Sequence, residues 1–410
     1  PVPILKNLSR GSNKGGDAKQ TTALNQPKAL PLIDGDGYLY LPDVNSNYAT
    51  TLDDSSLDIT GDLVIDVDVT MKSWTPAFNS SFCGKYLPTG DQRSFRFVLR
   101  PDKKLQFYFS DDGTASSLSG VTSTVVVPFS NNQRGQVRVA FNSSNGIFQF
   151  FTSTDKGQNW TQLGDDRTQS RTSIFNSTAD VFMGAFNHNA ELLNDAAIHS
   201  VKFYDSVTPS SSSLRFNCDF TATNVRHGDT KFACATGQAV TINQSGNDPA
   251  TIIKKPVLRF DGANGFMDGV FGQTVTEGGY AFAAFSVLGD GGEPWGRVLS
   301  FNATGGQDYQ NGGHTFIIKS DATNNVSLPT GTETEMFDDV NGDILIEAGR
   351  GANYRKSRIN NASVKSQVTA NTMSFDEFNL GSAWNGTSSS CIDLEYLALF
   401  PASITDDQAD

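Results

Sequence analysis

The residues that usually build zinc sites and acid–base centres are scarce in this chain. In 410 residues there are four cysteines and four histidines, and charged residues make up 18%. The cysteines form no CxxC pair, which excludes a structural zinc site of the usual spacing. So few histidines and charges also argue against a dense catalytic or metal centre. The cysteines are Cys83, Cys218, Cys234 and Cys391.

An excess of basic residues and long apolar runs are both absent from the sequence. There are 31 Lys and Arg against 44 Asp and Glu, a net charge of −13. Long-range attraction to a phosphate backbone is therefore absent, and we expect no nucleic-acid partner. No apolar run approaches the roughly 20 residues of a membrane helix, so we expect no membrane partner. With 29 Phe, the chain has the apolar content of a folded protein rather than of an acidic tail.

Residues 1–29 have no hydrophobic period. They are rich in Gly, Lys, Gln and Ser, and the stretch 11–16 cannot bury a core. We therefore expect a flexible N-terminal arm that docks on other proteins. The start at Pro1 shows no basic, apolar secretory leader, which favours synthesis in a cytoplasm.

One short sequence pattern occurs twice in the chain. It consists of apolar residues, an Asp-Gly pair, a second turn that contains Gly, and an aromatic residue. The copies are Leu32–Tyr38 and Leu258–Phe266, and strand-like sequence follows each. A repeat of this kind predicts two similar domains. We place the first at 30–207 and the second at 257–410, joined by a β-rich connector at 208–256.

Alternating apolar residues predict strands throughout, and helical periodicity is nowhere sustained. Between Leu63 and Met71 every second residue is apolar, and the closing runs Ile198–Tyr204 and Ile392–Phe400 match each other. Such alternation is typical of antiparallel sheets with one buried face. The fold class is all-β, and units of this size with Gly, Asn and Ser turns predict two tandem jelly-roll sandwiches.

The residues of the first domain resemble a known family. They are Asp34-Gly35 with Tyr38, the strand from Leu63, Trp74-Thr75-Pro76, Ser94–Phe97, Phe151–Asp155 leading to Trp160–Gly164, and Ser173–Phe175. These resemble laminin-G-like, concanavalin A-like domains of the kind found in bacteriophage tail and other virion surface proteins. The resemblance covers 30–256 specifically and 257–410 more weakly. It implies two concanavalin A-like sandwiches and a structural protein on the surface of a virion.

Catalytic residues are not identifiable. Glucanases with this fold carry Glu-x-Asp-x-Glu signatures, which this chain lacks, and it has no Gly-x-Ser-x-Gly. Three acidic pairs stand two residues apart, and we interpret Asp66 with Asp68 and Asp393 with Glu395 as solvated strand faces. The third pair is Glu333 with Glu335. We therefore expect a protein that is not an enzyme.

One acidic turn is a candidate for calcium. Asp338, Asp339, Asn341 and Asp343 lie in the string Asp-Asp-Val-Asn-Gly-Asp, which resembles part of a calcium loop. The bidentate Glu of an EF-hand is missing at its spacing, and an Asn-Gly hairpin turn explains the string better. We therefore expect no required cofactor, with calcium as the alternative.

Sugar recognition needs exposed aromatic faces with amide or carboxylate partners. Trp74 and Trp295 follow the first long strand of the two copies, and Tyr309 and Trp384 lie in Gly- and Asn-rich stretches. These four residues are the glycan-binding candidates. The alternative role for a Trp in a sandwich is a packing anchor.

These patterns predict a non-enzymatic virion protein of a tailed bacteriophage, displayed on the capsid or on the tail or its fibres. We expect it to contact other virion proteins through its arm, to self-associate, and to bind host-surface glycans. The alternative is a secreted carbohydrate-binding or adhesion protein, in which Asn-x-Ser/Thr sequons are used and Cys218 pairs with Cys234. A third interpretation is a glucanase.

Overall fold

The computed structural model consists of two compact units, which we call the first unit, residues 32–254, and the second unit, residues 1–31 together with 255–410. The structure describes residues 4–5, 18–19, 27–42, 46–188, 190–193, 195–245, 248–263, 265–276, 278–289, 296–302, 317–320, 326–327, 343–351, 354–360, 365–368, 375–382 and 390–400. Within that part of the chain, no helix has the length and apolar character to cross a membrane.

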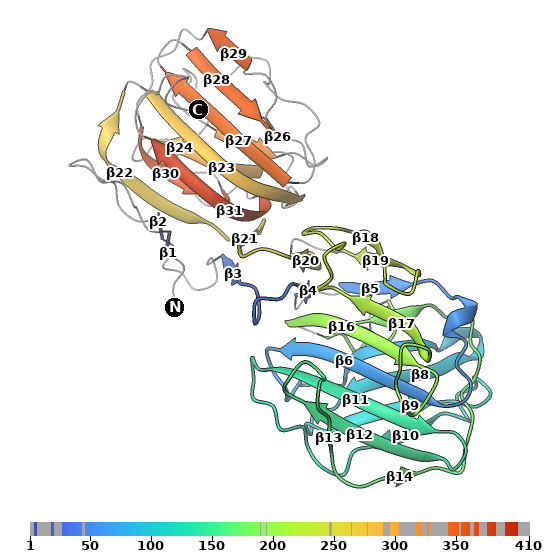
Figure 1. The fold of residues 1–410 in the computed structure, drawn as a ribbon. Coiled ribbons are helices and arrows are strands. Elements are labelled where there is room, and N and C mark those ends of the chain that lie inside the picture. The colour runs from blue at the N-terminus through green and yellow to red at the C-terminus, as the bar shows by residue number, and fades with distance from the viewer. Residues whose placement is uncertain are drawn as a thin grey trace. The chain divides into compact units, whose positions relative to one another are not determined.

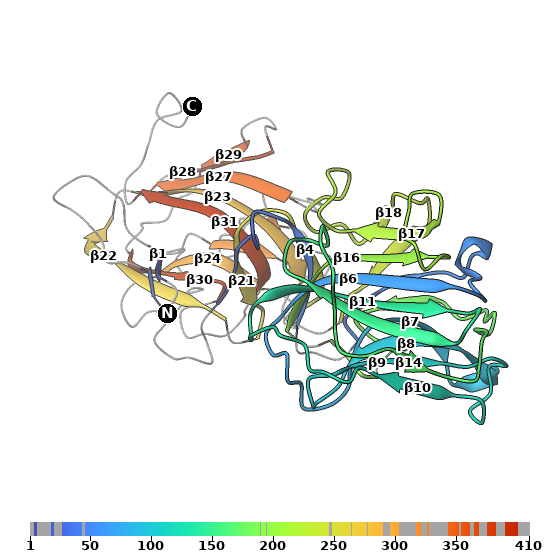
Figure 2. The same ribbon diagram turned by 60° about the horizontal axis from the view of Figure 1, so that its bottom comes forward.

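The first unit is a sandwich of two antiparallel sheets, seen face-on in Figure 1 and stacked in Figure 2, where β6 and β11 lie over β7 and β8. The nine-stranded sheet has the order β13 (Thr161–Gln162), β12 (Ile147–Ser153), β11 (Arg134–Asn142), β6 (Leu63–Met71), β16 (Ala196–Tyr204), β4 (Tyr38–Leu41), β20 (Thr251–Ile253), with β14 (Arg167–Thr168) on β12 and β17 (Leu214–Asp219) on β16.

The eight-stranded sheet closes the other side of the first unit. Its order is β10 (Ser119–Thr122), β9 (Leu105–Phe109), β8 (Gln92–Leu99), β7 (Ser80–Leu87), β15 (Val181–Met183), β5 (Tyr48–Thr51), β19 (Ala239–Asn243), β18 (Lys231–Ala233). Two short 3-10 turns, η2 (Ser55–Leu57) and η3 (Thr89–Asp91), lie in the connections.

Alternation in the sequence explains which face of each strand is buried. On β6, the apolar residues predicted to share a side all lie in the core, whereas Asp66 and Thr70 on the other side are half-buried. The core is rich in phenylalanine. Phe141 and Phe148, which are register partners on β11 and β12, stack with their ring centroids 4.4 Å apart.

The second unit repeats this architecture with two sheets of seven described strands each. One has the order β29 (Lys365–Val368), β28 (Tyr354–Ile359), β27 (Asp343–Gly351), β23 (Gly278–Gly289), β31 (Cys391–Phe400), β21 (Val257–Asp261), β3 (Lys28–Leu30). The other has the order β1 (Ile4–Leu5), β2 (Ala18–Lys19), β22 (Met267–Val275), β30 (Phe375–Leu380), β24 (Gly296–Asn302), β25 (Ile317–Ser320), β26 (Val326–Ser327). The expected all-β class and the two jelly-roll sandwiches are therefore confirmed.

The two units are equivalent, but the predicted register of the repeat is wrong. Gly184 and Gly381 occupy equivalent places. Each has a positive φ, and an added Cβ would clash with Leu41 on β4 at Gly184 and with Phe260 on β21 at Gly381. This makes β21 the counterpart of β4. Asp34-Gly35 therefore precedes the shared strand, whereas Asp261-Gly262 follows it. The two Asp-Gly turns look alike because tight turns of any kind draw on the same few residues.

The N-terminal segment also differs from the expected flexible arm. Its described strands are paired in the second unit: Leu30 lies opposite Val257 on β21, and Lys19 lies opposite Asp268 on β22. Strands of two or three residues are too short to show a hydrophobic period in the sequence. Their pairing at the edge of a sheet depends on the open edge that the other strands provide.

The segment 208–256, expected as a separate connector, lies within the two sheets of the first unit. Its strand β17 pairs with β16, β19 pairs with β5, and β20 pairs with β4. The break at 208–213 is therefore a loop inside this unit, because the strands after it complete both sheets.

Candidate functional site

Trp74 is not a surface residue, which corrects the prediction of a stacking platform there. Its side chain is fully buried and packs on Phe129, with ring centroids 4.6 Å apart. The indole Nε1 donates to the carbonyl of Gln133 at 3.0 Å, and the Trp74 amide donates to Asn131 Oδ1 at 2.9 Å. With no exposed ring face, Trp74 cannot stack on a sugar, and it acts as a packing anchor.

The other glycan and calcium candidates lie almost wholly outside the described residues. Trp295, Tyr309 and Trp384 do so, and so do Asp338, Asp339, Asn341, Glu333 and Glu335. Asp343 is the first residue of β27, but its side chain is not described. Among the residues that the structure does describe, no group of three or more His, Cys, Asp or Glu side chains is placed to hold a metal.

The acidic pairs interpreted as solvated faces are in fact ion-paired. Asp66 bonds Arg138 at 2.5 and 2.7 Å, and Asp68 bonds Arg134 at 2.7 and 2.9 Å. Asp393 is completely buried in a two-bond ion pair with Arg259, at 2.7 and 2.8 Å. Burial of Asp393 corrects the prediction of a solvated face. Alternation alone cannot reveal it, because a buried carboxylate next to a cation has the same sequence pattern as an exposed one.

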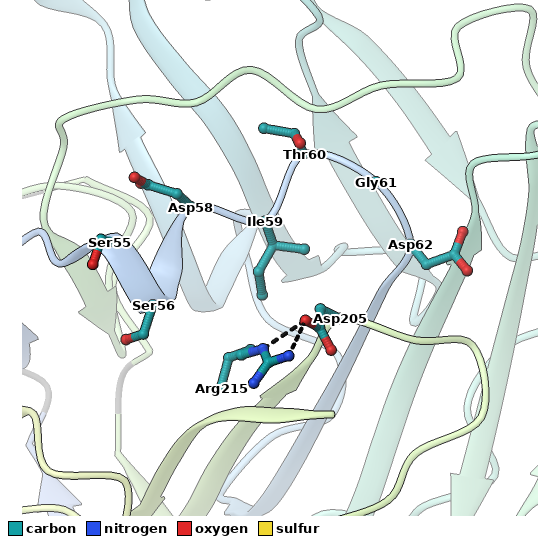
Figure 3. A pocket seen from close by; sticks show the side chains of 9 residues that line it. All are labelled: Ser55, Ser56, Asp58, Ile59, Thr60, Gly61, Asp62, Asp205 and Arg215. Carbon is teal, nitrogen blue, oxygen red and sulfur yellow. Dashed lines mark hydrogen bonds and ion pairs between the residues drawn. The ribbon is translucent and has the colours of Figure 1, made fainter. Parts of the chain in front are cut away.

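The candidate functional site is a polar hollow of about 440 Å³ on the first unit (Figure 3). The segment from η2 to the start of β6 forms one side, and the paired side chains of Asp205 and Arg215 form the other. The lining residues are Ser55, Ser56, Asp58, Ile59, Thr60, Gly61, Asp62, Asp205 and Arg215. Hydroxyl, carboxylate and guanidinium groups thus line the hollow, whose aliphatic residue, Ile59, is only 6% exposed.

Buried anchors hold the η2 side of this hollow in place. Leu57 and Ile59 insert into the core, and the ammonium group of Lys85 lies beneath them with only 1% of its side chain exposed. Lys85 Nζ bonds Asp58 Oδ1 at 2.8 Å and Asp53 Oδ1 at 2.6 Å. A site held in this way binds without a large ordering cost.

The opposite wall is tied to η2 by one amide side chain. Gln238 Nε2 donates to Ser56 Oγ at 2.7 Å and to the carbonyl of Arg215 at 3.0 Å. Arg215 Nε donates to Asp205 Oδ2 at 2.5 Å, and the two side chains are 40% and 33% exposed. The pair is therefore fixed in position yet reachable from solvent.

The hollow is mildly acidic. Its three carboxylates, together with Asp53, which shares Lys85 with Asp58, face Arg215 in the lining and Lys85 beneath, which leaves two surplus negative charges. Asp62 Oδ1 also accepts hydrogen bonds from Ser143 N at 2.8 Å and Ser143 Oγ at 2.7 Å. An anionic ligand would meet net repulsion here. A neutral ligand rich in hydroxyl groups, however, would find both donors and acceptors.

A smaller hollow of about 250 Å³ lies on the nine-stranded sheet, lined by Ala140, Asn142, Asn145, Ile147, Gln149, Asp166 and Val207. On the same sheet the half-buried ring of Trp160 lies over Arg138, whose Cζ is 4.0 Å from the ring centroid. Because the guanidinium of Arg138 covers one face of the indole, Trp160 is held mainly by a cation–π contact.

The large hollow was not predicted from the sequence, because its two walls are about 150 residues apart in the chain and no short motif spans them. One signal was available, namely the run Asp54–Asp62, in which Asp, Ser and Thr dominate directly before a long strand. Such a run marks a turn rich in hydrogen-bonding groups.

Comparisons with known proteins identify no family for this chain. No protein-family model matches it, and no curated protein matches its sequence. Among solved structures it is similar to the LG1-3 region of the laminin alpha2 chain, with 9% identity, a TM-score of 0.33, and coverage of 89% of this chain and 62% of that one. It is also similar to a putative carbohydrate-binding protein from Bacteroides ovatus, with 10% identity, a TM-score of 0.38, and coverage of 54% and 60%.

A third similar structure is the enzymatically active domain of tailspike protein 2 from bacteriophage CBA120, with 8% identity, a TM-score of 0.33, and coverage of 52% of this chain and 34% of that one. All three scores are low. The similarities therefore assign neither a family nor an activity to the chain.

Proposed function

We propose that the chain is a non-enzymatic glycan-binding protein and that its first unit binds a neutral sugar in the hollow between η2 and the Asp205–Arg215 pair. The observation that carries this proposal is the composition of the lining. Hydroxyl, carboxylate and guanidinium groups line the hollow, and the wall that holds them is anchored by Leu57, Ile59 and Lys85. A sugar offers a matching set of hydroxyl groups.

The proposal that the protein is not an enzyme rests on the hydrogen-bonding partners of the acidic side chains. A glycosidase needs one protonated carboxyl group as acid and a second as nucleophile or base. Each carboxylate of the hollow instead has a partner already: Asp58 bonds Lys85, Asp62 bonds Ser143, and Asp205 bonds Arg215. The hollow therefore favours binding over hydrolysis. Release of reducing sugar from a bound glycan would contradict the proposal that the protein is not an enzyme.

The test is a glycan-array screen with the full-length chain and two variants. Arg215→Ala removes a charged donor and should weaken binding about ten-fold or more. Gly61→Leu should block the hollow. A Cβ at Gly61 meets only Ser143 Oγ, at 3.6 Å, which is an ordinary contact, so the backbone there accepts a side chain.

A matched control is available in the same unit. Arg171 pairs with Asp111 at 2.9 Å, with side chains 30% and 37% exposed, much like the pair in the hollow. Arg171→Ala should leave glycan binding unchanged. The proposal fails if no glycan binds, or if binding survives both Arg215→Ala and Gly61→Leu.

We further propose that the protein is displayed on the surface of a tailed-bacteriophage virion, where a glycan-binding unit would contact the host envelope. The support is the resemblance of the first unit's sequence to virion domains, together with the acidic, two-sandwich chain. Mass spectrometry of purified particles should detect the protein. Its absence from particles, together with retention of glycan binding, would favour a secreted carbohydrate-binding protein instead.

A further inference from the structure

The outer faces of the two equivalent sheets differ in chemistry. In the first unit, Asp66 on β6 lies opposite Arg138 on β11 and Lys202 on β16. The corresponding strands of the second unit are β23, β27 and β31. There, Phe282 lies opposite Glu347 and Ala398. A charged row in one unit is thus largely replaced by apolar residues in the other.

The neighbouring row shows the same replacement more strongly. Asp68 of the first unit lies opposite Gln136 and Ser200. In the second unit, Ala284 lies between Leu345 on β27 and Tyr396 on β31, and these two side chains are 50% and 57% exposed. We call Phe282, Ala284, Leu345, Tyr396 and Ala398 the apolar patch. Leu345 and Tyr396 are exposed, and Phe282, Ala284 and Ala398 beside them are half-buried. Adjoining accessible apolar side chains on a sheet face mark an interaction surface.

The patch lies on the three adjacent strands β27, β23 and β31, which continue on both sides into β28 and β21 (Figure 1). Because these strands pair with each other and with neighbours on both sides, a partner must bind through side chains and not by adding a strand. The centre of the patch is aliphatic apart from two aromatic rings. The polar groups at its borders are already ion-paired with each other, so the centre suits another apolar surface better than a sugar.

Charges of both signs border the patch on its two sides. On β27 and β28, Glu347 Oε2 bonds Arg358 at 2.6 and 2.8 Å. On the side of β31, Glu395 Oε1 bonds Lys255 Nζ at 2.6 Å. A two-fold axis through the patch would bring these borders against each other, so that each acidic group can face a basic one.

We propose that the apolar patch is the self-association surface of the protein and binds the same patch of a second copy. The net charge of −13 makes two copies repel each other at long range, so a contact that holds them must be short-range and apolar. An apolar centre with a border of mixed charge satisfies this requirement. Association should therefore strengthen as salt screens the repulsion.

The experiment is sedimentation of the full-length chain over a range of concentrations and salt. We expect a monomer–dimer equilibrium that Leu345→Lys and Tyr396→Lys each weaken ten-fold or more, since each places an ammonium group in the apolar interface of both copies. Val270→Lys is the matched control. Val270 is 48% exposed on β22 of the other sheet, and this variant should associate as the natural chain does.

A cross-linking measurement provides a second test. The four natural cysteines are all buried, so Leu345→Cys and Tyr396→Cys each introduce a single exposed thiol. A two-fold axis through the patch places residue 345 of one copy opposite residue 396 of the other, so mild oxidation of a mixture of these two variants should join one copy of each. Val270→Cys, mixed with either variant, should give little covalent dimer.

A chain that stays monomeric at all concentrations, or a dimer unaffected by both lysine variants, overturns the proposal. If Tyr396→Lys instead abolishes glycan binding by a monomeric chain, the patch is a sugar site and the proposal is wrong.

Discussion

At the scale of single residues, His199 links stability to pH. Burial lowers the pKa of this imidazole from 6.5 to about 4. Nδ1 lies 3.1 Å from the carbonyl of Gly37, and Nε2 lies 3.2 Å from Thr70 Oγ1. A carbonyl only accepts, so Nδ1 carries the proton and Nε2 accepts from Thr70, which is the neutral form of the ring.

Stability should therefore fall between pH 6.5 and pH 4. In this range the unfolded chain binds a proton at His199 that the folded chain does not, and the loss should approach about 3 kcal/mol at the lower end. Urea unfolding of the natural chain and of His199→Gln across this range measures it. The variant should lose less stability on acidification, and identical pH profiles would contradict the assignment.

The buried pair of Arg259 and Asp393 makes a second residue-scale prediction. Both side chains have no solvent exposure. Asp393→Asn should cost about 3–5 kcal/mol, because it leaves the guanidinium charge buried without its counter-charge. Calorimetry of the second unit's transition measures the loss.

Replacing both partners provides the control for the Arg259–Asp393 pair. Arg259→Met with Asp393→Leu removes both charges and should restore most of the stability, since apolar replacements of a buried pair are often neutral. If the double variant is as unstable as Asp393→Asn, then contacts of these two side chains with other residues contribute more to stability than the ion pair itself.

At the scale of elements, the second unit depends on strands from the other end of the chain. In the second unit β3 pairs with β21, just as β20 pairs with β4 in the first unit. In the other sheet of the second unit, β2 pairs with β22, and β1 is the outermost strand. Deleting residues 1–31 should lower the melting temperature of the second unit and leave that of the first unchanged, because it exposes the edge of β21.

Scanning calorimetry resolves the two contributions if each unit melts separately. A shorter deletion, residues 1–26, keeps β3 and should have a smaller effect. If both deletions leave the two transitions unaltered, the pairing of β3 with β21 contributes little to stability.

At the scale of the whole molecule, the state of the cysteines distinguishes the proposed virion protein from the secreted alternative. Cys83, Cys218, Cys234 and Cys391 are all buried free thiols, and burial raises the pKa of Cys218. A thiol reagent should label none of them in the folded chain and all four after denaturation.

Intact mass under non-reducing conditions completes this test. Four free thiols fit a protein assembled in a cytoplasm, as proposed for a virion protein. A bridge between Cys218 and Cys234, together with attached glycans on the sequons, would favour the secreted alternative.

The sequence by itself determined the local elements and the all-β class. Leu63–Met71 forms the strand β6 with the predicted bounds, and the closing runs of the two units form the equivalent strands β16 and β31. Alternation and turn residues act over a few neighbours, so such elements can be predicted from the chain alone.

Only the tertiary structure decided the register of the repeat, the pairing of the N-terminal strands and the site. The burial of Trp74 and of Asp393 depends on what packs against them, and the hollow joins Ser55–Asp62 to Arg215 across about 150 residues of sequence. Edge pairing and side-chain burial are set by contacts between distant segments, and no local pattern encodes those contacts.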